Sequence, residues 1–276
     1  MERGSKVVLD ELKICYVTTL ESLKPLMVVG TGETIEVGLY KLHRMVNSRF
    51  KYFFSMIDHE GEVGHIKFCP YTDAPFSATT YVYLKVQNKT LYDKERLLLI
   101  LSIPEEMGMV FNNYTELHLA IDTTKNVPSL IKRLLRDKTI TTIINGRVVK
   151  DRKKIQPGIF FEYSTSLDRL KHPTLTFKQR KAVSNKVSGI TIQAYDKKSE
   201  IENHSDKQYI LEYYGHPKSL YRLEVRIPYQ EIKDYFAKEE TLLPLELVNG
   251  QTALQEMFFY HLSSVLRFRK GRNVIQ

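Results

Sequence analysis

The segment Tyr221-Arg-Leu-Glu-Val-Arg-Ile227 alternates strictly between apolar and polar side chains. Successive side chains of a β-strand point to opposite faces of the sheet. The odd-numbered residues therefore form an apolar face, and Arg222, Glu224 and Arg226 share a polar face. An antiparallel strand of this kind can pack its apolar face on helices and present its polar face to water or to a ligand. The segment predicts an antiparallel sheet with two chemically different faces.

The strand pattern recurs along the chain. Strands are expected near residues 7–17, 62–69, 81–87, 115–122, 159–164, 174–180, 190–196 and 220–227. Asn145-Gly146 lies between two β-rich runs and predicts a hairpin, because a type I′ turn needs positive φ at both central residues. Residues 33–46 and 49–57 are apolar and aromatic without a clear period.

Helical patterns separate these strands. Residues 93–102 fit a helix that ends before Pro104, Asn126 is placed to cap the next helix, and residues 250–268 fit a C-terminal helix. We therefore expect an α+β fold with a mainly antiparallel β-sheet, helices on one face of that sheet and a C-terminal helix.

The composition is that of a chain with a substantial core. Of 276 residues, 42% are hydrophobic, so the chain can fold around a buried interior. Residues 1–235 are expected to form the sheet-based domain, and residues 236–276 a helical extension packed on it.

Cys15 and Cys69 belong to no CxxC pair and are expected to be reduced thiols, which favours a cytoplasmic location. No apolar run has the length of a signal peptide or a membrane span.

Positive charge is concentrated in one quarter of the chain. Residues 125–198 hold 18 Lys and Arg against 5 Asp and Glu, a local net charge of +13 in a chain whose total is +9. This concentration favours a polyanionic partner, nucleic acid rather than a membrane surface. The residues expected to hold phosphates are Lys150, Arg152, Lys153, Lys154, Lys178, Arg180, Lys181 and Lys186.

Three side chains on the polar strand faces are typical metal ligands. They are His118 and Asp122 on the strand near 115–122, and Glu224 on the strand near 220–227. Oxygen ligands with one imidazole suit Mg²⁺ or Mn²⁺, and the lack of a Cys/His cluster speaks against structural zinc. A plain solvated sheet face would show the same alternation, so this interpretation competes with the metal site.

Three segments occur in an order that resembles a known family. They are Glu116-Leu-His-Leu-Ala-Ile-Asp122, then Tyr195-Asp-Lys-Lys198 with Glu200 close behind, then Tyr221-Arg-Leu-Glu-Val-Arg-Ile227. The acidic strand, the Tyr-Asp-Lys segment and the Arg-x-Glu-x-Arg strand together resemble rolling-circle replication initiators of small plasmids and filamentous phages, the replication initiation factor type. The resemblance covers about residues 115–235.

The resemblance implies an HUH-endonuclease-like fold and a metal-dependent, site-specific endonuclease of the nickase type. In such initiators a tyrosine attacks one phosphodiester of the origin, becomes linked to the 5′ phosphate and frees a 3′-OH for the host polymerase. Tyr195 is the candidate nucleophile here. A free tyrosine has a pKa of about 10, so Lys197, two residues along the same strand face, is the candidate that stabilises the phenolate. The implied partners are single-stranded or supercoiled origin DNA and host replication proteins.

The chain departs from the family pattern at three points. His118 stands where such proteins often carry Asp, Thr176 and Phe177 stand where some relatives show Tyr, and the His-hydrophobic-His motif of the wider superfamily is absent. Two other functions therefore stay open. One is a non-catalytic nucleic-acid-binding regulator, and the other is a metal-dependent nuclease that uses water as its nucleophile.

Overall fold

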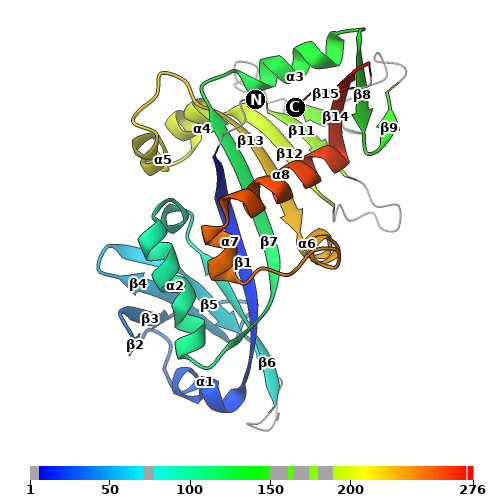
Figure 1. The fold of residues 1–276 in the computed structure, drawn as a ribbon. Helices are drawn as coiled ribbons and strands as arrows, with labels where there is room; N and C mark the ends of the chain where they lie inside the picture. Colours follow the sequence, from blue (N-terminus) through cyan, green and yellow to red (C-terminus); the bar gives the residue numbers. More distant parts are fainter. Residues whose placement is uncertain are drawn as a thin grey trace. The chain divides into compact units, whose positions relative to one another are not determined.

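The computed structural model describes residues 6–70, 78–149, 161–163, 174–179, 189–271 and 273–275. The fold is α+β with a mainly antiparallel sheet, as the sequence predicts (Figure 1). The chain forms two compact units. Unit 1 comprises Met1–Leu9, His118–Glu231 and Gly250–Gln276, and unit 2 comprises Asp10–Leu117 and Ile232–Asn249.

The strands of the larger sheet are β1 (Val7–Thr19), β2 (Thr34–Val37), β3 (Tyr40–Arg44), β4 (Tyr52–Asp58), β5 (Gly61–Phe68), β6 (Thr79–Val86), β7 (Val110–Thr123), β10 (Phe161–Tyr163), β11 (Leu175–Lys178), β12 (Thr191–Asp196) and β13 (Tyr221–Pro228). A smaller sheet consists of β8 (Ile140–Ile144), β9 (Arg147–Val148), β14 (Leu266–Lys270) and β15 (Asn273–Ile275).

The helices are α1 (Leu20–Met27), the short 3₁₀ helix η1 (Lys89–Tyr92), α2 (Lys94–Glu106), α3 (Val127–Arg136), α4 (Lys197–His204), α5 (Gln208–Tyr213), α6 (Tyr229–Phe236), α7 (Pro244–Asn249) and α8 (Gln251–Val265). No helix in the described ranges is long and apolar enough to cross a membrane.

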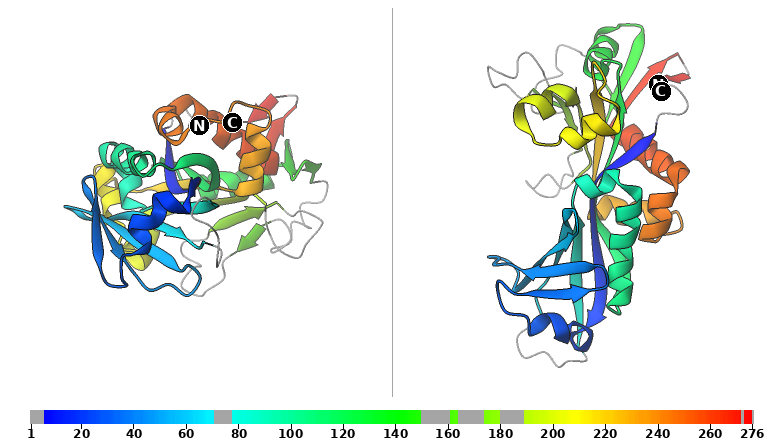
Figure 2. Two further views of the ribbon diagram at one scale, coloured as in Figure 1. Left: turned by 90° about the horizontal axis from the view of Figure 1, so that it is seen from below. Right: turned by 90° about the vertical axis from the view of Figure 1, so that its left-hand side faces the viewer.

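The sheet of unit 2 has the strand order β1-β6-β5-β4-β3-β2, and its strand pairs are antiparallel. Its core face carries a row of buried side chains, because Ile14, Leu84, Ile66 and Phe54 lie opposite one another on β1, β6, β5 and β4. Helix α2 lies along this sheet (Figures 1 and 2). Its Ile100 packs so closely on β5 that a Cβ atom at Gly64 would lie 3.0 Å from the Ile100 Cδ1. The alternate side chains of these strands point away from the core.

In unit 1 the strand order is β10-β11-β12-β13-β7. Phe177, Ile192 and Val225 lie opposite one another on β11, β12 and β13, and all three are fully buried. Helices α3 and α8 pack against β13 (Figure 1). The polar side chains of the same strands therefore share the other face.

Local signals in the sequence are confirmed at both helix and hairpin ends. Asn145 has φ 49° and Gly146 has φ 76°, and they join β8 to β9. Asn126 caps α3, where its side chain accepts a hydrogen bond of 2.9 Å from the Ser129 amide. Cys15 and Cys69 are both free thiols.

Three expectations differ from the structure. The aperiodic residues 33–46 and 49–57 contain β2, β3 and β4, because buried and half-buried positions mix there and mask the two-residue period. Helix α2 continues through Pro104 to Glu106 rather than ending before the proline. The C-terminal helix stops at Val265, because Leu266 and Phe268 turn their alternating side chains inward as β14, which pairs with β8.

One boundary between the compact units falls between Glu231 and Ile232, but the units are not continuous in the sequence. Each unit combines segments that are far apart in the sequence, and β1 and β7 each contribute residues to both. The residues after 235 therefore do not form one helical extension, since α7 belongs to unit 2 and α8 to unit 1.

Candidate active site

Glu224 lies at the centre of a polar cluster on the sheet of unit 1. Its side chain is 1% exposed. Its Oε2 accepts a hydrogen bond of 3.0 Å from the Tyr195 hydroxyl, and its Oε1 accepts one of 2.7 Å from Arg226 Nε. His118 Nδ1 lies 3.4 Å from the same Oε1. One buried carboxylate thus connects a phenol, a guanidinium and an imidazole.

The strand register explains why Tyr195 and Glu224 meet. On β12 and β13, Gln193 lies opposite Glu224 and Tyr195 lies opposite Arg222. Tyr195 is therefore the diagonal neighbour of Glu224 on the same face, at a separation that a long aromatic side chain can span. The alternation in the sequence predicts this shared face, and the structure brings the two residues together.

Asp122 lies on the polar face of β7 but has a different partner from the one predicted. Arg222 donates to it twice, from Nε to Oδ1 at 2.7 Å and from Nη2 to Oδ2 at 2.6 Å. Both side chains are fully buried. Each oxygen of Asp122 accepts a hydrogen bond from the guanidinium, and the expectation of Asp122 as a metal ligand beside His118 and Glu224 stays a prediction. The pair fixes the acidic strand against β13.

Lys197 does not continue the strand face of Tyr195. The strand ends at Asp196, which caps α4 by accepting from the Ser199 amide, and Lys197 is the first residue of that helix. Lys197 is buried, and its Nζ donates to Glu200 Oε2 at 2.7 Å. The same Nζ lies 5.7 Å from the centre of the Tyr195 ring. Lys197 therefore contributes positive charge near the phenol from a helix rather than from the strand.

Within unit 1, His118 and Glu224 offer an imidazole and a carboxylate that could hold a metal ion. Asp10 is a buried residue of β1 whose Oδ1 accepts from Asn88 Nδ2 at 3.2 Å and from the Tyr92 hydroxyl at 3.4 Å. The sequence analysis did not single out Asp10. In the sequence Asp10 and Glu11 interrupt an apolar run, and an acid that is buried there needs a partner.

Most of the expected phosphate-binding residues lie outside the described residues. This holds for Lys150, Arg152, Lys153, Lys154, Arg180, Lys181 and Lys186. Lys178 is described and lies at the end of β11.

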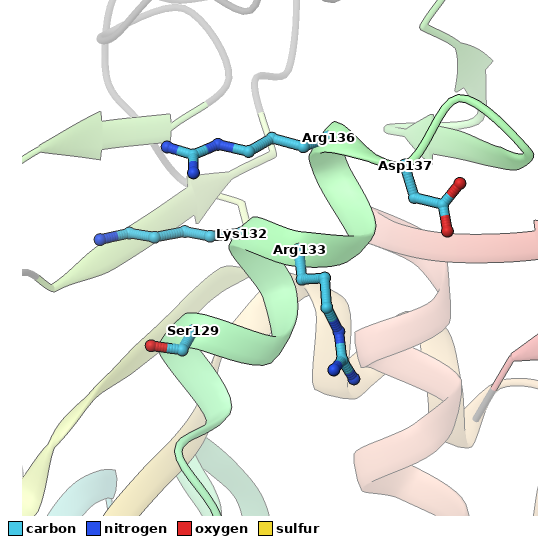
Figure 3. A pocket seen from close by; sticks show the side chains of 5 residues that line it. All are labelled: Ser129, Lys132, Arg133, Arg136 and Asp137. Atoms are coloured by element: carbon cyan, nitrogen blue, oxygen red, sulfur yellow. The ribbon is translucent and has the colours of Figure 1, made fainter.

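A second basic surface, which the sequence analysis did not single out, lies on α3. Ser129, Lys132, Arg133, Arg136 and Asp137 line a pocket there (Figure 3). Lys132 and Arg136 extend from the helix in the same direction (Figure 3), as expected for residues four apart. Burial, and then the nearby Arg136, lower the pKa of Lys132. The signal was present in the sequence as the spacing of Ser129, Lys132 and Arg136 on one helical face.

A comparison with solved structures gave a likeness in fold. The solved structure of a rolling circle replication initiator protein from Geobacillus stearothermophilus matches with a TM-score of 0.47 and 14% identity, over 98% of this chain and 89% of that chain. No protein-family model and no curated protein matches the sequence.

Proposed function

We propose that the protein is a DNA replication initiator that nicks one strand at an origin through a tyrosine transesterification and so starts rolling-circle replication. The observation that carries the proposal is the hydrogen bond between the Tyr195 hydroxyl and Glu224 Oε2. It joins a candidate nucleophile to a carboxylate that can take its proton, which is the arrangement that nucleophilic catalysis needs.

In the proposed step, the Tyr195 oxygen forms a bond to phosphorus, and its proton passes to Glu224 Oε2. The bond between phosphorus and the 3′ oxygen breaks, and that oxygen takes up a proton and leaves as a 3′-OH. The 5′ phosphate stays on Tyr195 as a phosphotyrosine, which keeps the strand end available for rejoining.

Positive charge near the cluster suits the phosphate. Arg226 donates to Glu224 Oε1, and its side chain is 43% exposed, so its outer face remains open to solvent. Lys197 lies near the Tyr195 ring, where a cation lowers the cost of forming a phenolate. These two residues would orient the phosphate and favour the charged nucleophile.

The donor set fits a hard divalent cation. A carboxylate and an imidazole are ligands of the type that Mg²⁺ and Mn²⁺ accept. Glu224 and His118 would hold the ion from β13 and β7. A bound Mg²⁺ or Mn²⁺ would act as a Lewis acid on the phosphate oxygens.

The test uses Mn²⁺ or Mg²⁺ and the supercoiled DNA element that encodes the protein. We expect a protein–DNA adduct that survives boiling in detergent. Tyr195→Phe removes only the hydroxyl, so the adduct should vanish while the fold persists. Tyr213→Phe, on the half-exposed pair of α5, is the matched control and should form the adduct.

Each alternative function gives a different result. Cutting without an adduct would identify a nuclease that uses water, and binding without cutting would identify a regulator. An adduct that persists in Tyr195→Phe would overturn the assignment of the nucleophile. The linked peptide would then be searched for Tyr163, Tyr213, Tyr214 and Tyr221 by mass spectrometry.

A further inference from the structure

The sheet of unit 2 carries aromatic and basic side chains on the face opposite its core. On this face Phe53 of β4 lies opposite Lys67 of β5, and Lys67 lies opposite Tyr83 of β6. His65 and Lys85 lie opposite each other one step along the same strands. Neighbouring strands are about 4.8 Å apart, so the residues of each row are adjacent. We call Phe50, Phe53, His65, Lys67, Tyr83 and Lys85 the aromatic–lysine face.

The rings on this face are half-buried rather than covered. Phe53 and His65 lie with ring centres 5.0 Å apart, and Phe50 and Tyr83 lie 6.0 Å apart. Lys67 Nζ lies 4.7 Å from the centre of the Phe50 ring. Each ring keeps part of its surface in solvent, and the packing between rings restricts their orientations. Half-buried aromatic side chains can offer part of their rings to a ligand.

The face also has a local excess of positive charge at Lys67. Burial, and then the positive charges of Lys13, Lys85 and Arg49, lower its pKa. Lys13 and Lys85 are paired with Glu11 at 3.0 and 3.3 Å, and Lys13 also with Glu116. In the described part of the chain, no acid pairs with Lys67. An anion that arrived at Lys67 would therefore relieve repulsion without displacing a carboxylate of the described residues.

Acidic side chains border the face and limit where an anion can lie. Glu62 accepts from Ser55 at 2.7 Å and lies 3.2 Å from His65 Nε2. Glu11 is half-buried between the lysines that it holds. The anion site is thus restricted to the side of Lys67 and Arg49, next to the rings of Phe50 and Tyr83.

We propose that the aromatic–lysine face binds single-stranded nucleic acid, with bases stacked on Phe53 and Tyr83 and a backbone phosphate on Lys67. Bases can stack on protein rings only when they are unpaired, so a duplex would not fit this chemistry. A single-stranded nucleic acid offers both groups that this face can bind, because its bases are free to stack on rings and its backbone phosphates can contact Lys67. This binding goes beyond the proposed nicking reaction and requires none of its residues.

The experiment measures the affinity of the full-length protein for a fluorescein-labelled oligothymidylate of about 15 nucleotides by fluorescence anisotropy. Tyr83→Leu and Phe53→Leu keep an apolar side chain and remove the ring, and each should weaken binding by about tenfold. Lys67→Gln should also weaken it and should reduce its dependence on salt. Tyr83→Phe keeps the ring and should bind as the wild type does.

Two controls separate this surface from the rest of the protein. Lys24→Gln removes an exposed lysine of α1 in the same unit and should leave the affinity unchanged. Lys218→Gln removes an exposed lysine of unit 1 and should also leave the affinity unchanged. The assay measures binding alone, so a failure of the nicking reaction would not affect this result. Folded Tyr83→Leu and Phe53→Leu variants with wild-type affinity would overturn the proposal.

A crosslinking experiment covers the case in which these variants do not fold. The wild-type protein is irradiated with an oligothymidylate that carries 5-iodouracil, and the linked peptides are identified by mass spectrometry. Crosslinks to the peptides that contain Phe53 or Tyr83 are expected. Crosslinks confined to peptides of unit 1 would overturn the proposal.

Discussion

Arg222 and Asp122 form a two-pronged ion pair in which neither side chain is exposed, with hydrogen bonds of 2.7 and 2.6 Å. Each oxygen of this carboxylate accepts one hydrogen bond from the guanidinium. The pair thus joins the polar face of β7 to that of β13 inside unit 1.

Removing one partner of this pair should cost substantial stability. In Asp122→Asn the guanidinium of Arg222 would remain buried without a counter-charge. The free energy of unfolding should fall by about 3 to 5 kcal/mol, measured by urea denaturation followed by circular dichroism. Asp206→Asn, an exposed acid of the same unit, is the control and should shift stability by less than about 0.5 kcal/mol. A loss that small in Asp122→Asn would show that the pair is dispensable.

Alternation along the strands predicts which residues share a face but not which of them are partners. The sequence placed His118, Asp122 and Glu224 on polar faces, and the structure confirms the faces. Which carboxylate faces Arg222 and which faces His118 depends on the register between β7 and β13, and no local pattern encodes that register. The same limit applies to Lys197, because Asp196 ends the strand by capping α4. Strand propensity alone did not show where the helix would begin.

Asp10 illustrates a different limit. Its residue type did not distinguish Asp10 from the adjacent Glu11, because acids in strands are common at the surface. What distinguishes Asp10 is that it is buried and accepts hydrogen bonds from Asn88 and Tyr92, which are distant in the sequence. Such contacts appear only when the strands have been paired.

Neutralising Glu224 should weaken metal binding while it preserves the shape of the site. Glu224→Gln keeps an oxygen for the Tyr195 hydroxyl but loses the negative charge that a divalent cation needs. The affinity for Mn²⁺ should fall on the order of tenfold or more, as measured by titration calorimetry. Glu200→Gln removes a carboxylate that pairs with Lys197 outside the cluster and should bind Mn²⁺ normally. Equal Mn²⁺ affinity in Glu224→Gln and the wild type would remove Glu224 from the ligand set.

Stability should depend on pH through His261. Burial in α8 lowers the pKa of His261 to about 4 from the ordinary value of 6.5. The unfolded chain binds a proton below pH 6.5, while the folded chain keeps the imidazole neutral. This group therefore destabilises the fold as the pH falls from about 6.5 to about 4. The pKa difference corresponds to a loss of about 3 kcal/mol over this window.

The His261 contribution can be isolated by substitution. His261→Gln removes the titrating group, so the pH dependence of its unfolding free energy between pH 6.5 and 4 should be flatter than that of the wild type. His216→Gln, an exposed histidine of unit 1, should leave the wild-type slope in place. Parallel curves for His261→Gln and the wild type would contradict a buried neutral imidazole.

The basic face of α3 should bind backbone phosphates of DNA. Within the described ranges Arg136 has no ion-pair partner, and it extends beside Lys132 over the pocket that Ser129 also lines (Figure 3). A phosphate there would meet two cations and a hydroxyl group. Asp137 also lines the pocket, but its Oδ1 accepts from the amide and the hydroxyl of Thr139, which keeps it engaged at the end of the helix.

Salt dependence gives the measurement. Each phosphate contact contributes about −0.9 to the slope of log affinity against log salt concentration, because binding releases counterions. Lys132→Gln and Arg136→Gln together should weaken binding to a labelled duplex of arbitrary sequence and make this slope shallower by about one to two units. Lys218→Gln, an exposed lysine elsewhere in unit 1, should change neither quantity. Unchanged slopes in the double variant would place the duplex away from α3. Each phosphate contact that is lost means that fewer counterions are released on binding, so the slope would have to change.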